Sequence, residues 1–421
     1  MADRLTPPVR YPRYGEKPAD NGFGKKKSAD REDHTRESFH KSKLSQWFVL
    51  GGFDVPYFAL VMILLAIGLV MLLSASYPTA YFNGENSYSF FIKQAAFAVV
   101  GVIAMLVASK IDYTIYKKYA HFIYAGALIL LVVVLFYHTN KTSGSGEDFK
   151  RYIPVGPLTF QPSEIGKFAL IVALSAYFCR FSNKISTFLY GIFIPLAIIG
   201  VYCGLVALEN HVSGMILMFA LGASIMFSGG TKSWIFWLGI IAVAAIVLVV
   251  FMFPDILPDY VKAKLQAFTD KEFEPLRGRW QINNSLYAIG SGGLFGVGLG
   301  NSKQKYMYVS DPQNDFIFSI VCEELGFIGA LVILLLFALL VFRGIQISMK
   351  ARDKFGSFLV MGITAQVGIQ TVLNILVITD SIPNTGISLP FFSYGGTALM
   401  MLLFEMGVVL SVSRKANQRK V

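Results

Sequence analysis

The stretch QKYMYVSDPQNDFIFSIVCEELGFIGALVILLLFALLV, residues 304–341, decides the fold class of this chain. Its second half is an apolar run long enough to cross a bilayer as a helix, which takes about 20 residues. Its first half is polar, and Asp315 stands where the polar part meets the apolar run. A carboxylate at this boundary is close to water and to molecules held in the membrane. The stretch therefore predicts a membrane-spanning helix with a candidate reactive group at its start.

Composition extends this prediction to the whole chain. Of its 421 residues, 54% are hydrophobic and only 15% are charged, whereas soluble domains carry about 25% charged residues. We therefore expect an all-α polytopic membrane protein with about ten transmembrane helices. The apolar runs that predict these helices lie near residues 54–77, 89–109, 118–138, 163–180, 186–208, 212–229, 233–253, 316–342, 356–378 and 391–412.

The distribution of basic residues predicts the orientation. Lysine and arginine gather in alternate connections, whereas the connections near 78–88, 209–211 and 379–390 contain neither. Because cytoplasmic connections are enriched in basic residues, we expect both termini to be cytoplasmic. One large extracytoplasmic loop, residues 254–315, then joins the seventh and eighth spans. The basic residues on the predicted cytoplasmic side are Lys110, Lys117, Lys118, Arg180, Lys184, Lys232, Arg343, Lys350, Arg352, Lys354, Arg414, Lys415, Arg419 and Lys420.

Three parts of the chain differ in composition. Residues 1–46 are polar and basic, which predicts a disordered cytoplasmic tail. Residues 47–412 form the predicted membrane domain, and 413–421 a second basic cytoplasmic tail. The net charge of +11 indicates contact with anionic lipid rather than nucleic acid, because no basic stripe with interleaved aromatic residues is present. The cysteines predict neither a disulfide framework nor a zinc site, because all lie in apolar runs: Cys179, Cys203 and Cys322.

The segment RYIPVGPLTFQPSEIGK, residues 151–167, is the first candidate binding element. Ser163 is expected to cap the fourth span, with Glu164 in its first turn and Lys167 three residues further on. Two interpretations stay open. Arg151, Lys167 and the free N–H groups of the helix start could hold an anionic headgroup. Alternatively, Glu164 and Lys167 form a local ion pair, with the lysine extended towards the interface.

Asp315 heads the second candidate element. Its simplest role is to cap the eighth span, but Asp315, Ser319 and Glu323 also share one helical face. Glu323 and Glu324 lie about 12–14 Å further along the helix, at a depth where acidic groups are functional or paired. We hypothesise that both acids are structural partners of a polar stripe on the ninth span. That stripe consists of Gln366, Gln370 and Asn374.

Three other features complete the analysis of the residues. The segment DSIPNTGISLPFFSYGGTALM, residues 380–400, contains Ser393 and interrupts the start of the last span with prolines and glycines. Irregular backbone at membrane depth lines a cavity or is buried, so this segment is a predicted wall of the site. Apolar spacing from residue 256 to 268 predicts an amphipathic interfacial helix. Glu405, deep in the last span, has no partner that the sequence reveals.

Four segments together resemble the SEDS family (shape, elongation, division and sporulation) of polytopic peptidoglycan glycosyltransferases. They are RYIPVGPLTFQPSEIGK, GSGGLFGVGLGNSKQK, NDFIFSIVCEELGFIG and NTGISLPFFSYGG, and the resemblance covers most of residues 50–413. Within the family, NSKQK and NDFIF are more similar to the FtsW (cell-division) branch than to the RodA branch.

The resemblance implies an enzyme of the cytoplasmic (inner) membrane that polymerises lipid II at the outer face, at the division septum. The family's aspartate falls on Asp315, as the catalytic base, and its membrane-edge lysine on Lys167. Further substrate-binding candidates are Arg151, Glu164, Lys303, Lys305 and Ser393. A divalent cation (Mg²⁺ or Mn²⁺) held by Asp315 stays open, and no other cofactor is indicated.

The implied partners are the growing lipid-linked glycan, a single-pass class B penicillin-binding protein and other membrane proteins of the division complex. Nucleic acid is not among them. The alternatives are a flippase or transporter of the lipid-linked precursor, and a sporulation- or elongation-specific SEDS paralogue.

Overall fold

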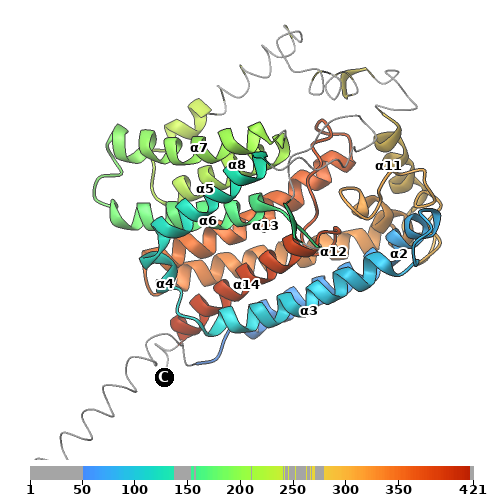
Figure 1. Ribbon diagram of the computed structural model, residues 1–421, viewed down its shortest axis with the longest axis horizontal. Helices are drawn as coiled ribbons and strands as arrows, with labels where there is room; N and C mark the ends of the chain where they lie inside the picture. Colours follow the sequence, from blue (N-terminus) through green and yellow to red (C-terminus); the bar gives the residue numbers. More distant parts are fainter. Residues whose placement is uncertain are drawn as a thin grey trace, which may run out of the picture. The chain divides into compact units, whose positions relative to one another are not determined.

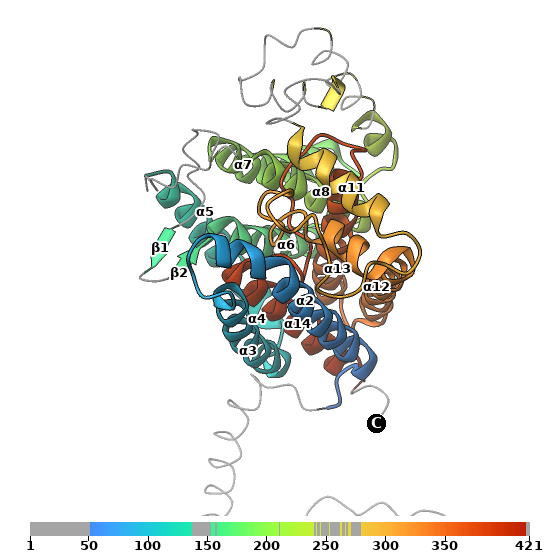
Figure 2. The same ribbon diagram turned by 90° about the vertical axis from the view of Figure 1, so that its right-hand side faces the viewer.

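The computed structural model describes residues 51–136, 153–155, 158–209, 211–239 and 279–417, with a few isolated positions between 240 and 270. Within these ranges the chain is helical, apart from one short antiparallel ribbon of β1 (Ile153–Val155) and β2 (Leu158–Phe160). The helices run side by side in a bundle (Figures 1 and 2). They are α2 (Val55–Phe82), α3 (Ser89–Lys110), α4 (Thr114–Lys118), α5 (Ala120–Phe136), α6 (Pro162–Arg180), η1 (Leu189–Phe193), α7 (Ile194–Leu208), α8 (Val212–Ser228), α11 (Trp280–Ser291), α12 (Ile317–Lys350), α13 (Lys354–Ile378) and α14 (Gly396–Asn417).

Seven helices of the described part are long and apolar enough to cross a membrane, counting η1 and α7 as one. The two shorter apolar helices α5 and α8 coincide with two further predicted spans. The all-helical, membrane-spanning fold class is therefore confirmed. The seventh predicted span, residues 233–253, and the predicted interfacial helix lie largely outside the described residues, so the count of ten spans stays a prediction.

The centre of the bundle consists of α6, α13 and α14. Two thirds of the apolar stretch of α6 and of α14 is buried within the protein, against about a fifth of that of α3. The peripheral helices present exposed apolar side chains to the surroundings, as expected where lipid takes the place of water. The polar residues of α6, α13 and α14 are consequently held inside the bundle.

One end of the bundle is fixed by ion pairs at helix ends. Asp54 caps α2 by accepting a hydrogen bond from the Tyr57 N–H at 3.0 Å. The Arg343 guanidinium donates to both carboxylate oxygens of Asp54, at 3.0 and 2.9 Å. Lys415 pairs with Asp112 at 2.7 Å. We call this the basic end, because it carries the connections that the sequence predicts to be cytoplasmic.

α12 is interrupted at Gly326, whose φ of 68° and ψ of −173° are not helical. Two regular helical hydrogen bonds are lost there, and the loop of residues 292–305 replaces them. The carbonyls of Glu323 and Glu324 accept from the N–H groups of Val297 and Gly298, both at 3.0 Å. In return, the N–H groups of Phe327 and Ile328 donate to loop carbonyls at 2.9 and 3.1 Å. We call residues 292–305 the glycine loop.

Candidate functional site

Asp315 lies just before α12, at the end of the bundle opposite the basic end. The N-cap of α12 is Phe316, so the structure does not place Asp315 in the capping position that the sequence suggested. The residue is partly buried. A Cβ added to Gly386 would lie 3.1 Å from the Asp315 Oδ2 atom. Gly386 therefore leaves room beside the carboxylate, and its φ of +69° favours glycine for a second reason.

Asn374 of α13 holds the backbone of Asp315 and the backbone that follows Gly386. Its side-chain amide donates to the carbonyl of Asp315 and to that of Ile387, both at 2.7 Å. The Asn374 side chain is fully buried. Helical spacing predicts that Asn374 belongs to a polar stripe, but it does not reveal that Asn374 clamps Asp315 to the 381–395 segment. The only indication of this clamp was a buried asparagine that lies opposite two irregular segments of the chain.

The segment 381–395 runs without helix from α13 to α14 and is tied to the residues before Asp315. The Ser393 hydroxyl donates to the Asn314 carbonyl at 2.7 Å and accepts from the Leu389 N–H at 2.8 Å. The Tyr394 N–H donates to the Gln313 carbonyl at 2.8 Å. The predicted wall segment therefore lies directly beside Asp315. Ser393 stabilises this arrangement by hydrogen bonds to the backbone of Asn314 and Leu389.

Lys167 and Glu164 form an ion pair of 2.8 Å at the start of α6. The Lys167 residue is only 3% exposed, so its ammonium is buried rather than extended to the interface. The expected cap was wrong: Gln161 is the N-cap and Pro162 follows at the start of the helix. Proline suits that position because its φ is fixed near the helical value and it has no N–H to satisfy. Ser163 consequently lies inside the first turn.

A small cavity of about 40 Å³ brings the two candidate elements together. Glu164 lines one side and Ser393, next to the Asp315 segment, lines another. Gln366, Gln370 and Ser388 also contribute to its polar lining. This volume has room for a few water molecules, not for a sugar. The cavity therefore lies between Glu164, the partner of Lys167, and the wall segment beside Asp315.

Glu405 of α14 has a partner that the sequence did not reveal. Its carboxylate accepts a hydrogen bond from the Gln366 amide at 2.9 Å and is fully buried. Lys167 and Glu164 are its charged neighbours. Gln366 therefore pairs with an acid of the last helix, and the hypothesis that it faces Glu323 and Glu324 was wrong.

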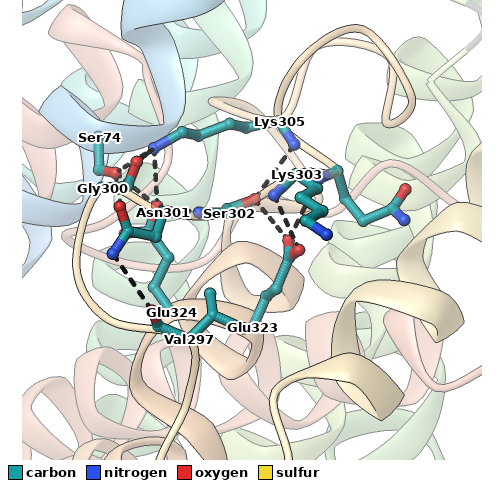
Figure 3. A network of polar contacts seen from close by, with 10 residues as sticks. Ser74, Val297, Gly300, Asn301, Ser302, Lys303, Lys305, Glu323 and Glu324 are labelled. Atoms are coloured by element: carbon teal, nitrogen blue, oxygen red, sulfur yellow. Dashed lines mark hydrogen bonds and ion pairs between the residues drawn. The ribbon is translucent and has the colours of Figure 1, made fainter.

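Glu323 and Glu324 instead bind the glycine loop (Figure 3). Glu323 accepts from the Ser302 hydroxyl and from the Lys303 N–H, the latter at 2.9 Å. Glu324 pairs with the Lys305 ammonium at 2.9 Å. Both acids reach the glycine loop because the break at Gly326 brings the loop backbone against α12. Both acids are structural partners, as expected, but of this loop and not of α13.

The two lysines of the glycine loop, Lys303 and Lys305, differ in whether their side chains are exposed to a ligand. The Lys305 ammonium also donates to the Ser74 hydroxyl at 3.0 Å and to the Gly300 carbonyl at 2.7 Å, and the residue is 3% exposed. It is therefore part of the network that holds the loop. The Lys303 side chain is exposed. Arg151 lies outside the described residues. Among the residues that are described, no three His, Cys, Asp or Glu side chains come together as metal ligands.

Comparisons with known proteins agree with this architecture. Residues 55–418 match the family described as cell cycle protein, FtsW/RodA/SpoVE. Stage V sporulation protein E of Bacillus subtilis is 36% identical over 362 residues, which cover 86% of this chain and 97% of that protein. The probable peptidoglycan glycosyltransferase FtsW of Geobacter sp. (strain M18) is 35% identical over 365 residues, with the same coverage.

Solved structures are similar in fold. A chain of a peptidoglycan synthase complex, described for the coordination of polymerisation and crosslinking, superposes with a TM-score of 0.70. It is 23% identical and covers 87% of this chain and 99% of its own length. The rod shape determining protein RodA of Thermus thermophilus superposes with a TM-score of 0.62, at 24% identity over 86% of this chain and 97% of its own.

Proposed function

The chain belongs to the FtsW/RodA/SpoVE family of cell cycle proteins, and we propose that it is a peptidoglycan glycosyltransferase that polymerises lipid II with Asp315 as its catalytic base. The observation that carries this assignment is the setting of Asp315. Asp315 is only partly buried at the end of a membrane-spanning bundle, and its carboxylate lies beside Gly386 of the wall segment. Relatives about 35% identical are named as probable peptidoglycan glycosyltransferases.

The reaction joins two lipid-linked sugars. The 4-hydroxyl of one sugar attacks the anomeric carbon of the other, the new glycosidic bond forms, and the bond to the polyprenyl diphosphate breaks. Asp315 takes the hydroxyl proton, and the diphosphate leaves with the electron pair. A positioned base typically contributes about 100- to 10,000-fold to such a step.

The departing diphosphate needs positive charge around it, because charge develops on its oxygens as the bond breaks. We assign this role to Arg151 and to the exposed Lys303. Lys167 as a direct ligand of the substrate stays a prediction, since its ammonium pairs with Glu164. A divalent cation held by Asp315 would supply the same charge, and loss of polymer when a chelator is added to the lipid II assay would support it.

For the biological setting we propose the outer face of the cytoplasmic membrane at the division septum, with a class B penicillin-binding protein and other division proteins as partners. The motifs NSKQK and NDFIF support the division branch. The separation of Asp315 from the basic end supports the outward orientation. A sporulation protein is an equally similar relative, so loss of the gene product should block septum formation rather than spore formation if division is the setting.

The decisive experiment uses the purified full chain in lipid with lipid II as its only substrate, and product length read on a gel. We expect polymer from the native chain and none from Asp315→Asn, with normal expression and thermal unfolding. Asp311→Asn, four residues earlier on the same loop and exposed, is the matched control and should polymerise normally. Polymer formed by Asp315→Asn would refute the base role. Transfer of lipid II between leaflets without polymer would favour the flippase alternative.

A further inference from the structure

The glycine loop turns apolar side chains outward. Leu294, Phe295 and Leu299 are 62%, 80% and 54% exposed. Beside them on α12, Phe327 is 61% exposed. Large exposed apolar groups on a loop are unexpected in water, and several in one patch indicate that something apolar covers them.

The patch is continuous with a surface that lipid covers. Below Phe327, the exposed side chains of α12 are all apolar along the face that points away from the bundle. They include Ile328, Leu331, Val332, Leu335, Leu339 and Phe342. The loop carbonyls of Gly293 and Leu294 accept from the N–H groups of Phe327 and Ile328, so the patch lies at the upper edge of this face.

Two polar contacts between α2 and α12 give the depth of the loop. Asp54 pairs with Arg343 at the basic end, and Ser74 donates to Glu324 at 2.7 Å at the other. Ser74 lies 20 residues after Asp54. At 1.5 Å per helical residue this separation along α2 is about 30 Å, the thickness of the hydrocarbon core. We therefore place its second boundary at the Ser74–Glu324 contact, so that Glu324 lies at this boundary and not deeper in the membrane as the sequence suggested, and Phe327 lies just inside it.

Aromatic residues support this level independently. Tyr77 and Tyr81, one to two turns beyond Ser74 on α2, are 43% and 68% exposed. Tyr306 and Tyr308, just after the glycine loop, are 48% and 50% exposed. Exposed tyrosines gather where hydrocarbon meets headgroups. The apolar side chains of the glycine loop lie next to this belt.

We propose that the glycine loop is a re-entrant element, with Leu294, Phe295 and Leu299 immersed in the acyl chains of the leaflet at the Asp315 end. The occupant of the patch is lipid. Irregular backbone survives at that depth only when its polar groups are satisfied by protein. The exchange of hydrogen bonds with the break in α12 satisfies them here. The glycines allow this close approach, because a Cβ on Gly296 would collide with the Glu324 carbonyl.

The test places an environment-sensitive fluorophore on the loop. The three native cysteines are replaced, a single cysteine is introduced by Phe295→Cys, and the labelled full chain is reconstituted in vesicles. Leu335→Cys on α12 is the lipid-exposed control, and Asn83→Cys, in the exposed turn after α2, is the water-exposed control. Thermal unfolding of each labelled chain checks that it is folded.

Quenchers at known depths then decide the outcome. We expect nitroxides near the top of the acyl chains to quench the label at residue 295 as strongly as nitroxides deeper in the chains quench residue 335. Iodide in the water should quench residue 83 and leave residue 295 bright. Equal quenching of residues 295 and 83 by iodide, without lipid quenching, would overturn the proposal. Protection from both quenchers would also overturn it, because a protein surface and not lipid would then cover the patch.

Discussion

Removal of the Asn374 amide should misplace the catalytic carboxylate. In Asn374→Ala, the carbonyls of Asp315 and Ile387 each lose a hydrogen bond of 2.7 Å, the first in a partly buried position and the second in a buried one. An unsatisfied buried group costs about 1–3 kcal/mol, so loss of the Ile387 contact alone weakens the native arrangement by about that amount. The segments can relieve part of this cost by moving apart, which shifts Asp315 away from Gly386. A displacement of about 1 Å at a reacting group can cost about 100-fold in rate.

The assay measures lipid II polymerisation per folded molecule, at a temperature at which native chain and variant are both folded. We expect turnover to fall by about 100-fold with little change in KM, because the substrate's contacts with the rest of the site remain. Thr371→Val is the matched control. Its hydroxyl donates only to the Val367 carbonyl within α13, at 2.8 Å, so its loss should leave turnover within about twofold. Native turnover in Asn374→Ala would refute the clamp.

Three further predictions concern other contacts. Gly386→Ala brings a methyl group to 3.1 Å from Asp315 Oδ2 at a φ of +69°; strain of about 1–2 kcal/mol should reduce polymerisation about 5- to 30-fold. Glu324→Gln leaves the buried Lys305 ammonium without its counter-ion, and thermal unfolding should show a loss of about 3–5 kcal/mol. Burial of Asp112 by itself would raise its pKa. Hydrogen bonds from Lys415 and Thr114 outweigh burial, so the pKa of Asp112 lies below its usual 3.8. The stabilisation that Asp112→Asn removes should therefore be full at neutral pH and disappear as pH falls below 3.8.

Each of these predictions has a control or a contrary result. Gly368→Ala on α13 would meet only the Val341 side chain, at 3.4 Å or beyond, and should polymerise normally. The double variant Glu324→Gln with Lys305→Met removes both charges and should recover part of the lost stability. For Asp112, an equal difference between native chain and variant at pH 7 and about pH 3 would contradict the ion pair.

The helices were predictable because the physics that forms them is local. An apolar run of about 20 residues must satisfy its backbone internally when lipid surrounds it, and this requirement depends on no distant contact. The break in α12 was not predicted. Gly326 stands two residues after Glu324 in a run that is otherwise apolar, and only the arrival of the glycine loop makes its irregular backbone stable.

The candidate site was predictable as a set of residues but not as a set of partners. Asp315 and the wall segment were recognised because charge and helix-breaking residues stand out in an apolar chain. The partners of Glu324 and Glu405 were not found, because helical spacing gives the face of each helix but not which helix lies opposite. Glu324 pairs with Lys305 of a distant loop and with Ser74, and Glu405 with Gln366; serine and glutamine are common residue types on apolar helices.

The charges around the cavity bear on how the two substrates are oriented. Among the described residues, Glu164 and Glu405 face one buried cation, Lys167, so the formal charge of these three side chains is not positive. A diphosphate placed there would meet carboxylates in a region where water screens little. The exposed Lys303 lies on the glycine-loop side. We therefore expect the donor's diphosphate on the glycine-loop side of Asp315 and the uncharged acceptor hydroxyl on the cavity side. On this arrangement Lys303→Ala should raise the KM for lipid II more than Lys167→Met does.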